Sequence, residues 1–291
     1  MEAVLDTLLA PLQYEFGVRA LLAAALVGLV CAIVGSYMVL RGLAFMGDAI
    51  SHAAFPGVVG AYLAQGSFYL GGAIAAVATA LAIGWISRRA RLRADTIIGV
   101  LFAGMFGLGI ALYAAIPNYV GDLFGFLFGD VLGISTEDLV ALGLIGGGVL
   151  LVVWALWKEF LYATFDPLGA AASGLPVGRL DYLFLALIAL TIVVSLQAVG
   201  IILVVAMLTT PAATAQLLSV RFGRLMATAA VIGVGSAVAG IELSFWLDLP
   251  SGAAIVLVQT ALFFVALALG PRTGRRMLGR QGRDGATGAG E

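Results

Sequence analysis

Long runs of apolar residues are the feature of this sequence that most limits its fold. Seven runs are near or above the roughly 18 residues that a helix needs to cross a bilayer, and two are shorter. Because lipid offers no water to unpaired backbone groups, such runs must be helices and cannot be barrel strands. We therefore predict an all-α, polytopic membrane helical bundle of eight or nine transmembrane helices. The long runs are residues 18–40, 68–86, 96–116, 139–157, 182–205, 225–247 and 253–269, and the short ones are residues 53–64 and 207–220.

Composition agrees with a membrane protein. Hydrophobic residues make up 62% of the chain and charged residues 11%, whereas an ordinary soluble domain has about 25% charged residues. The only cysteine, Cys31, falls inside the first predicted helix. It can form no internal disulfide, and we interpret it as a small core residue.

Basic residues give the predicted orientation, because cytoplasmic loops are enriched in Lys and Arg. With nine crossings and the N-terminus outside, all of them except Arg19 fall on the cytoplasmic side. We expect a membrane domain over residues 1–271, followed by a basic, Gly-rich and disordered cytoplasmic tail over residues 272–291. The basic positions are Arg41, Arg88, Arg89, Arg91, Arg93, Lys158, Arg179, Arg221, Arg224, Arg272, Arg275, Arg276, Arg280 and Arg283.

Acidic residues collect on the opposite side, among them Asp122, Asp130 and Asp248. A negative field at this outer mouth would concentrate cations. Solvation of carboxylates at helix ends explains the same pattern without any function, and both interpretations stay open.

The stretch that most strongly indicates a function is GDAISHAAFPG, residues 47–57, which contains the only histidine of the chain. Asp48 and His52 are four residues apart, so on a helix they lie one turn apart on one face. A charged carboxylate inside a bilayer needs a partner or a water-filled lining. A carboxylate and a neutral imidazole are common ligands of zinc and other divalent first-row metals. A purely structural Asp–His hydrogen bond is the alternative.

Glycine and proline favour a broken helix at this place. Gly47, Pro56 and Gly57 interrupt the short segment, and short, broken membrane segments are typical of substrate sites in transporters. Thr209 and Thr210 precede Pro211 in a second short segment, where a structural proline kink is an equally good explanation. The candidate pathway residues are Ser51, Thr209, Thr210, Gln197 and Glu242.

The connection over residues 157–183 is the longest on the basic side. Within it, ATFDPLGAAASG has the signals of a short helix, with Asp166 as the N-cap, Pro167 at the first helical position and Gly174 as the stop. A small-residue helix that projects from a membrane domain can bind in a groove of a partner protein. A simple connector is the alternative.

Several motifs of enzymes are missing. The phosphate-binding loop requires a lysine before Ser or Thr, and the only lysine, Lys158, follows a tryptophan. The chain has no G-x-S-x-G motif and no cysteine nucleophile beside a histidine. We therefore expect a protein that is not an enzyme, and any ATP hydrolysis must belong to another chain.

The sequence resembles the membrane permease subunits of bacterial ATP-binding-cassette importers for zinc, manganese and related metals. The resemblance covers about residues 40–267. It is carried by six blocks in order, which are RGLAFMGDAISHAAFPGV, DTIIGVLFAGMFGLGIAL, LFGDVLGIS, FDPLGAAASGLPVGRLD, SLQAVGIILVVAMLTTPAATAQLL and LDLPSGAAIVL.

This resemblance implies a homodimer in the bacterial inner membrane, two copies of a cytoplasmic ATP-binding subunit and an extracytoplasmic metal-binding protein. It implies that Asp48 and His52 coordinate the metal ion and that the ion crosses the membrane by alternating access. The cargo would be zinc or manganese, with iron as a further candidate, no cofactor would be bound permanently, and no nucleic acid is a partner. It also implies that the loop of about residues 158–181 binds the ATPase, mainly through Phe165, Asp166, Pro167, Ala170, Ser173 and Gly174.

Two rival functions fit part of the same pattern. A secondary transporter or channel would use Asp48 and His52 to relay protons or to gate cations, and it would need no ATPase. A permease of the same energy-coupled kind could instead carry a metal chelate, which would need a wider cavity, and the small residues of 99–112 are compatible with either cargo.

Overall fold

A computed structural model describes residues 13–90, 92–116, 131 and 133–269. Eleven helices follow one another in this part of the chain. Asp122, Asp130 and the predicted tail lie outside the described residues. The helices are α2 (Glu15–Leu40), α3 (Ala44–Leu63), α4 (Phe68–Arg89), α5 (Ala94–Ala114), α7 (Thr136–Ala155), α8 (Trp157–Phe165), α9 (Pro167–Ala172), α10 (Val177–Val199), α11 (Ile201–Leu218), α12 (Phe222–Leu247) and α13 (Ser251–Leu269).

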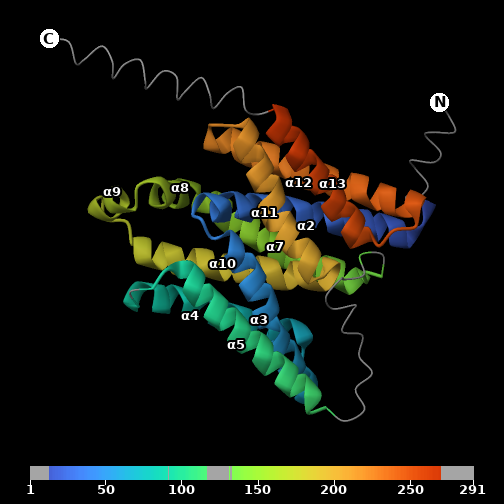
Figure 1. The fold of residues 1–291 in the computed structure, drawn as a ribbon, viewed down its shortest axis with the longest axis horizontal. Helices are drawn as coiled ribbons and strands as arrows, with labels where there is room; N and C mark the ends of the chain where they lie inside the picture. Colours follow the sequence, from blue (N-terminus) through green and yellow to red (C-terminus); the bar gives the residue numbers. More distant parts are fainter. Residues whose placement is uncertain (1–12, 91, 117–130, 132, 270–291) are drawn as a thin grey trace.

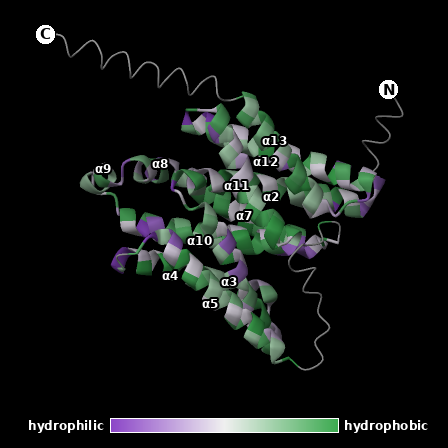
Figure 2. Ribbon diagram, viewed as in Figure 1, coloured by the Kyte–Doolittle hydropathy of each residue, from purple (hydrophilic) through white to green (hydrophobic). Residues whose placement is uncertain are grey.

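The all-α membrane bundle predicted from the sequence is confirmed. Among the described residues, eight helices are long and apolar enough to cross a membrane. α3 has 20 residues and is long enough as well, but Asp48 and His52 lower its hydropathy. Figure 2 shows hydrophobic residues along the long helices, and hydrophilic residues at the ends of α4 and α10 near α8 and α9.

One predicted span is wrong, because the apolar run 182–205 is divided between two helices. α10 ends at Val199 and α11 begins at Ile201, with Gly200 between them at φ 79°. Glycine reaches this left-handed region at no steric cost, whereas other residues rarely adopt it. Hydropathy cannot detect a turn of one residue inside a continuous apolar run. The short run that begins at residue 207 is therefore the second half of an 18-residue helix.

The prediction of a broken helix at the Asp–His pair is also wrong. α3 is one continuous helix, and Pro56 lies inside it. Proline removes a single backbone donor, and membrane helices tolerate this where neighbouring helices pack around the site. Here α5 supplies the space, because a Cβ atom at Gly109 would lie 3.2 Å from Cδ of Pro56. Pro211 is likewise inside the unbroken α11.

The helices form two groups that share one interface. α2 and α10 are the most buried of the candidate spans, and α2 packs against α7, α11 and α12. α3, α4 and α5 form the second group, in which α5 packs on α3 and α4 (Figure 1). This group contacts the first mainly through α10 and α11.

Side-chain contacts identify which helix ends lie together. Arg41 after α2, Arg88 of α4, Thr164 of α8 and Asp181 of α10 meet at one end of the bundle. Tyr69 of α4 and Asp138 of α7 meet at the other end. α2 and α4 therefore end, and α10 begins, at one end of the bundle, whereas α4 and α7 begin at the other. We call the end with Arg41 and Arg88 the basic end.

Candidate metal site

Asp48 and His52 lie on one face of α3, as their spacing predicted. His52 Nδ1 is 3.4 Å from Asp48 Oδ1 and 3.0 Å from the backbone oxygen of Asp48. Because a carbonyl oxygen only accepts, this contact favours the tautomer in which Nδ1 donates and Nε2 keeps its lone pair. The Asp48 side chain is 46% exposed and that of His52 is 17% exposed. The hydrogen bond of the structural alternative is thus compatible with metal binding, since Nε2 and the carboxylate are both left for a cation.

Aromatic rings of α5 hold the imidazole in place. The His52 ring meets Phe102 and Phe106 edge to face, with centroid distances of 4.9 and 5.2 Å. These two phenylalanines are themselves stacked. A ring clamped in this way keeps one orientation, which is what a ligand on a rigid helix needs.

Glycine allows α4 to approach the other side of α3. A Cβ atom at Gly57 would lie 2.2 Å from the backbone oxygen of Gly71, and one at Gly71 would lie 2.3 Å from that of Gly57. Both distances are far below van der Waals contact. The two backbones therefore touch directly, and α3 is held by α4 and α5 and also contacts α10 and α11, while the Asp48 side chain stays partly exposed.

This pair by itself is an incomplete coordination shell. Within the described ranges, no group of three or more His, Cys, Asp or Glu side chains is close enough to hold a metal ion. Zinc sites usually have four ligands, so a cation at Asp48 and His52 needs further ligands from water or from another molecule.

The candidate pathway residues have their own local contacts. Ser51 is fully buried, and its hydroxyl donates to the carbonyl of Gly47 at 2.8 Å. Thr209 and Thr210 line a cavity of about 230 Å³ against Thr260, Phe263 and Phe264 of α13. Leu208, not these threonines, is the residue of α11 that approaches Gly47 of α3.

Gln197, Glu242 and Asp248 belong to other parts of the bundle. Gln197 is half-buried near the end of α10. Oε2 of Glu242 on α12 is buried, and no hydrogen-bond partner for it is found among the described residues. Asp248 is the exposed C-cap of α12 at φ 54°, a left-handed conformation that aspartate tolerates better than most residues. Asp248 therefore lies in the turn between α12 and α13.

The short helix predicted after residue 165 is confirmed in detail. Asp166 caps α9, accepting a hydrogen bond from the Gly169 N–H at 2.8 Å, and Pro167 is the first helical residue. Gly174 ends the helix at φ 88°, and Leu175 N–H donates to Ala170 O as in a Schellman motif. Leu168 is 83% exposed and Phe165 is also exposed. α8 and α9 thus expose apolar side chains, and α9 lies beyond the ends of the long helices (Figure 1).

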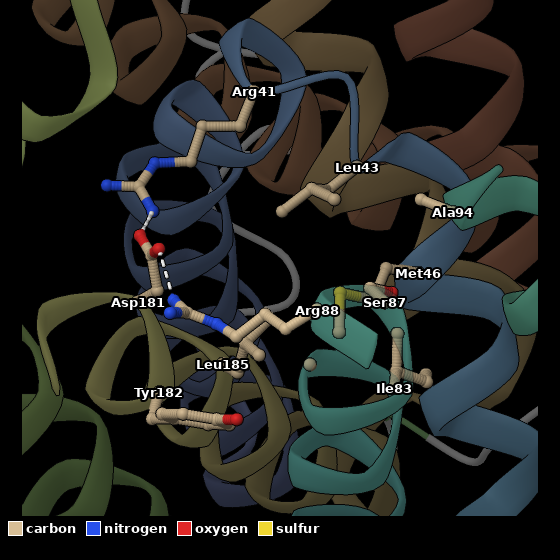
Figure 3. Close-up of a pocket in the computed structure, with 11 residues that line it drawn as sticks. Arg41, Leu43, Met46, Ile83, Ser87, Arg88, Ala94, Asp181, Tyr182 and Leu185 are labelled. Atoms are coloured by element: carbon tan, nitrogen blue, oxygen red, sulfur yellow. Dashed lines mark hydrogen bonds and ion pairs between the residues drawn. The ribbon is translucent and has the colours of Figure 1, made fainter. Parts of the chain in front are cut away.

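A charged cluster that the sequence did not predict lies at the basic end. Asp181 accepts from Arg41 Nη1 at 3.0 Å and from Arg88 Nη2 at 2.7 Å (Figure 3). Arg41 also donates from Nε to Thr164 Oγ1 at 2.9 Å. Burial lowers the pKa of the Arg41 guanidinium, and Asp181 opposes this effect. The basic residues had been used only for orientation, and the spacing of these partners in the sequence gave no signal.

A second polar contact was missed at the opposite end of α4. The Tyr69 hydroxyl donates to Asp138 Oδ1. Asp138 also completes a capping box with Ser135 at the start of α7. The capping box could have been found from the sequence STED, but its tyrosine partner could not.

Comparison with known proteins decides the family. A profile of the ABC 3 transport family matches residues 13–270. The chain belongs to this family. ABC 3 relatives include the manganese transport system membrane protein MntC of Halalkalibacterium halodurans, which is 48% identical over 90% of both chains. The chelated iron transport system membrane protein YfeD of Yersinia pestis is 42% identical, over 88% of this chain and 86% of its own.

A solved ABC 3 relative has the same fold. The structure of PsaBC from Streptococcus pneumoniae in complex with Fab matches with a TM-score of 0.84 and 32% identity, over 94% of this chain and 99% of that one. The predicted resemblance is confirmed. With its eight candidate spans, the chain is a multi-pass membrane transport protein and not an enzyme.

Proposed function

We propose that this chain is the permease subunit of an ATP-binding-cassette importer that moves a divalent transition-metal ion, with manganese as the first candidate. The observation that carries the proposal is the Asp48–His52 pair, a carboxylate and an imidazole with a free Nε2 on a membrane helix of an ABC 3 family chain. These two groups would replace part of the hydration shell of the ion while it passes by alternating access. The transported ion is the cargo, and no permanent cofactor is needed.

A second copy of the chain would complete the coordination shell. Phe45 is 73% exposed on α3, on the same side as Asp48. The neighbouring helix α5 exposes Gly99, Ala103 and Gly107, four residues apart, where closely packed membrane helices prefer small residues. A homodimer through this face would bring two carboxylates and two imidazoles to one ion.

The energy source would be a separate protein. No phosphate-binding loop is present in the sequence, so ATP would be hydrolysed by a separate subunit, in two copies. These copies would bind at α8 and α9, where Phe165 and Leu168 are exposed apolar contacts. The basic end would then lie in the cytoplasm, in agreement with the positive-inside rule, and the N-terminus outside the bacterial inner membrane. An extracytoplasmic metal-binding protein would deliver the ion to the opposite end.

We favour manganese over zinc as the transported ion because of the names of the relatives. Their names give manganese and chelated iron as cargo. Ligand type alone does not decide, since carboxylate and imidazole suit both manganese and zinc, and the general affinity order favours zinc.

The test is metal uptake into vesicles that contain this chain and are supplied with the metal-binding protein, with and without the ATPase. We expect ATP-dependent uptake of radioactive manganese, with no uptake when the ATPase is left out. Uptake driven by an ion gradient in the absence of the ATPase would instead establish a secondary transporter. Competition by unlabelled manganese, zinc or an iron chelate identifies the cargo, and stronger competition by the chelate than by any free ion would overturn the proposal of a bare ion.

A further inference from the structure

The helices that carry the candidate metal site, α3, α4 and α5, form a group that meets the rest of the protein along α10 and α11. Within it, α5 packs on α3 and α4. A group of this kind can move as a unit against its neighbours, as domains do in shear motions. The contacts between this group and the other helices therefore determine how a movement of those helices displaces Asp48 and His52.

The Arg41–Asp181–Arg88 cluster is one such attachment. Asp181 lies in the second turn of α10, and it accepts from Arg88 at the end of α4 and from Arg41 in the turn between α2 and α3. Both oxygens of the carboxylate are used, one by each guanidinium. The rings of Phe184 and Tyr182 support the two guanidinium groups, at 4.6 and 5.0 Å from the ring centroids.

This cluster also contacts the two helices that precede and follow α9 in the chain, α8 and α10. α8 leads into α9 and α10 follows it, and Arg41 is hydrogen-bonded to each of these two flanking helices, at Thr164 and Asp181. Arg41 is three residues before Ala44, where α3 begins. A displacement of α9 therefore acts on the start of the site helix through two hydrogen-bonded contacts and on the end of α4 through a third.

The surroundings leave room for such a movement. The Arg41 side chain is only 12% exposed, so its charge depends on Asp181 for compensation. Nη2 of Arg41 and the hydroxyl of Ser87 are buried, and neither has a hydrogen-bond partner among the described residues. A cavity of about 440 Å³ adjoins the cluster and is also lined by Leu43 and Met46 at the start of α3 (Figure 3).

We propose that Arg41, Asp181 and Arg88 are positioning residues that transmit movement of the α8–α9 segment to the helices of the metal site. The proposal rests on the function proposed above, since it assumes that an ATPase acts on α9. These residues do not contact the ion. They determine whether ATP hydrolysis is converted into movement of α3 and α4.

The test is Asp181→Asn in vesicles that contain the complete complex with its ATPase, with ATP hydrolysis and manganese uptake measured on the same sample. We expect hydrolysis to stay within about twofold of the wild type, and the number of ions moved per ATP to fall by at least about fivefold, that is by roughly 1 kcal/mol of coupling. Asp181→Glu retains the carboxylate and should recover part of the ratio. A purely structural role would lower uptake and hydrolysis together, and an unchanged ratio in Asp181→Asn would overturn the inference.

Two further variants make the outcome decisive. Asp95→Asn removes a carboxylate of the same end from an exposed pair with Arg93 at 3.8 Å, and it should leave the ratio unchanged. If Asp181→Asn does not fold, Arg88→Gln replaces it, because Arg88 is more exposed and the Arg41–Asp181 contact remains. Its ratio should also fall, and an unchanged ratio there overturns the inference equally. Absence of ATP-driven uptake in the wild type would instead refute the proposed function.

Discussion

The Asp48–His52 pair and the Arg41–Asp181–Arg88 cluster are both polar groups in a membrane protein, yet their partners differ. Asp48 is half-exposed, and its carboxylate oxygen is 3.4 Å from the imidazole. Asp181 has both oxygens bonded to guanidinium groups, at 3.0 and 2.7 Å. A group that must bind and release an ion needs free lone pairs, whereas a group that connects helices needs permanent partners. The number of unsatisfied ligand atoms thus separates the two roles.

The largest expected effect is the loss of uptake in His52→Ala. Loss of a residue that only orients a metal ligand already costs about 10–100-fold in affinity or activity, so loss of the imidazole should lower manganese uptake by at least about tenfold. Ser51→Ala is the matched control, since Ser51 is the preceding residue, is fully buried, and donates its hydroxyl to the Gly47 carbonyl of its own helix. Uptake by His52→Ala equal to that of the control, at equal protein levels, would remove this residue from the mechanism.

The second prediction concerns how the site helix is held, which depends on backbone contact and not on ion pairs. Gly57→Ala should lower the free energy of unfolding by about 1–3 kcal/mol, because the new methyl group overlaps the backbone of Gly71. Gly60→Ala, on the same helix, meets nothing within 4 Å and should stabilise by up to about 1 kcal/mol. Denaturant titration in detergent measures both. Equal stability of the two variants would contradict the close packing of α3 on α4.

The sequence was sufficient to predict those parts of the structure that depend on residues close together in the chain. The cap, the proline and the terminal glycine of α9 follow local rules, and all three are present at Asp166, Pro167 and Gly174. The face shared by Asp48 and His52 follows from helix geometry alone. Even so, the predicted break at Pro56 is absent, because a proline's effect on a helix depends on what packs around it.

Contacts between distant residues could not be predicted. Asp181 is 140 residues from Arg41 and 93 from Arg88, and nothing near any of them in the sequence indicates the others. The helix boundary at Gly200 could not be predicted for a different reason, since the sequence is apolar on both sides of this glycine. The cavity that Thr209 and Thr210 line against α13 likewise joins segments that are about 50 residues apart, so it gave no signal in the sequence.

The third prediction compares the two ends of α4. Tyr69→Phe removes the hydroxyl that bonds to Asp138 but leaves the capping box with Ser135 in place. We expect the free energy of unfolding to fall by about 1 kcal/mol, the usual net contribution of one hydrogen bond, with ions moved per ATP little changed. A double-mutant cycle with Asp138→Asn isolates the contact. A fall in that ratio as large as in Asp181→Asn would show that both ends of α4 contribute to coupling.

The smallest expected effect is that of Asp166, because α9 is a short helix beyond the ends of the bundle. Asp166→Ala removes the cap on Gly169 and should destabilise α9 by about 0.5–2 kcal/mol, while the thermal midpoint of the whole protein stays the same. Uptake should decrease modestly, because the ATPase would bind a partly unfolded α9. Asp166→Asn keeps an oxygen that accepts from Gly169 N–H and should restore uptake. Equal loss in both variants would mean that the charge of Asp166, not its capping of α9, matters to the partner.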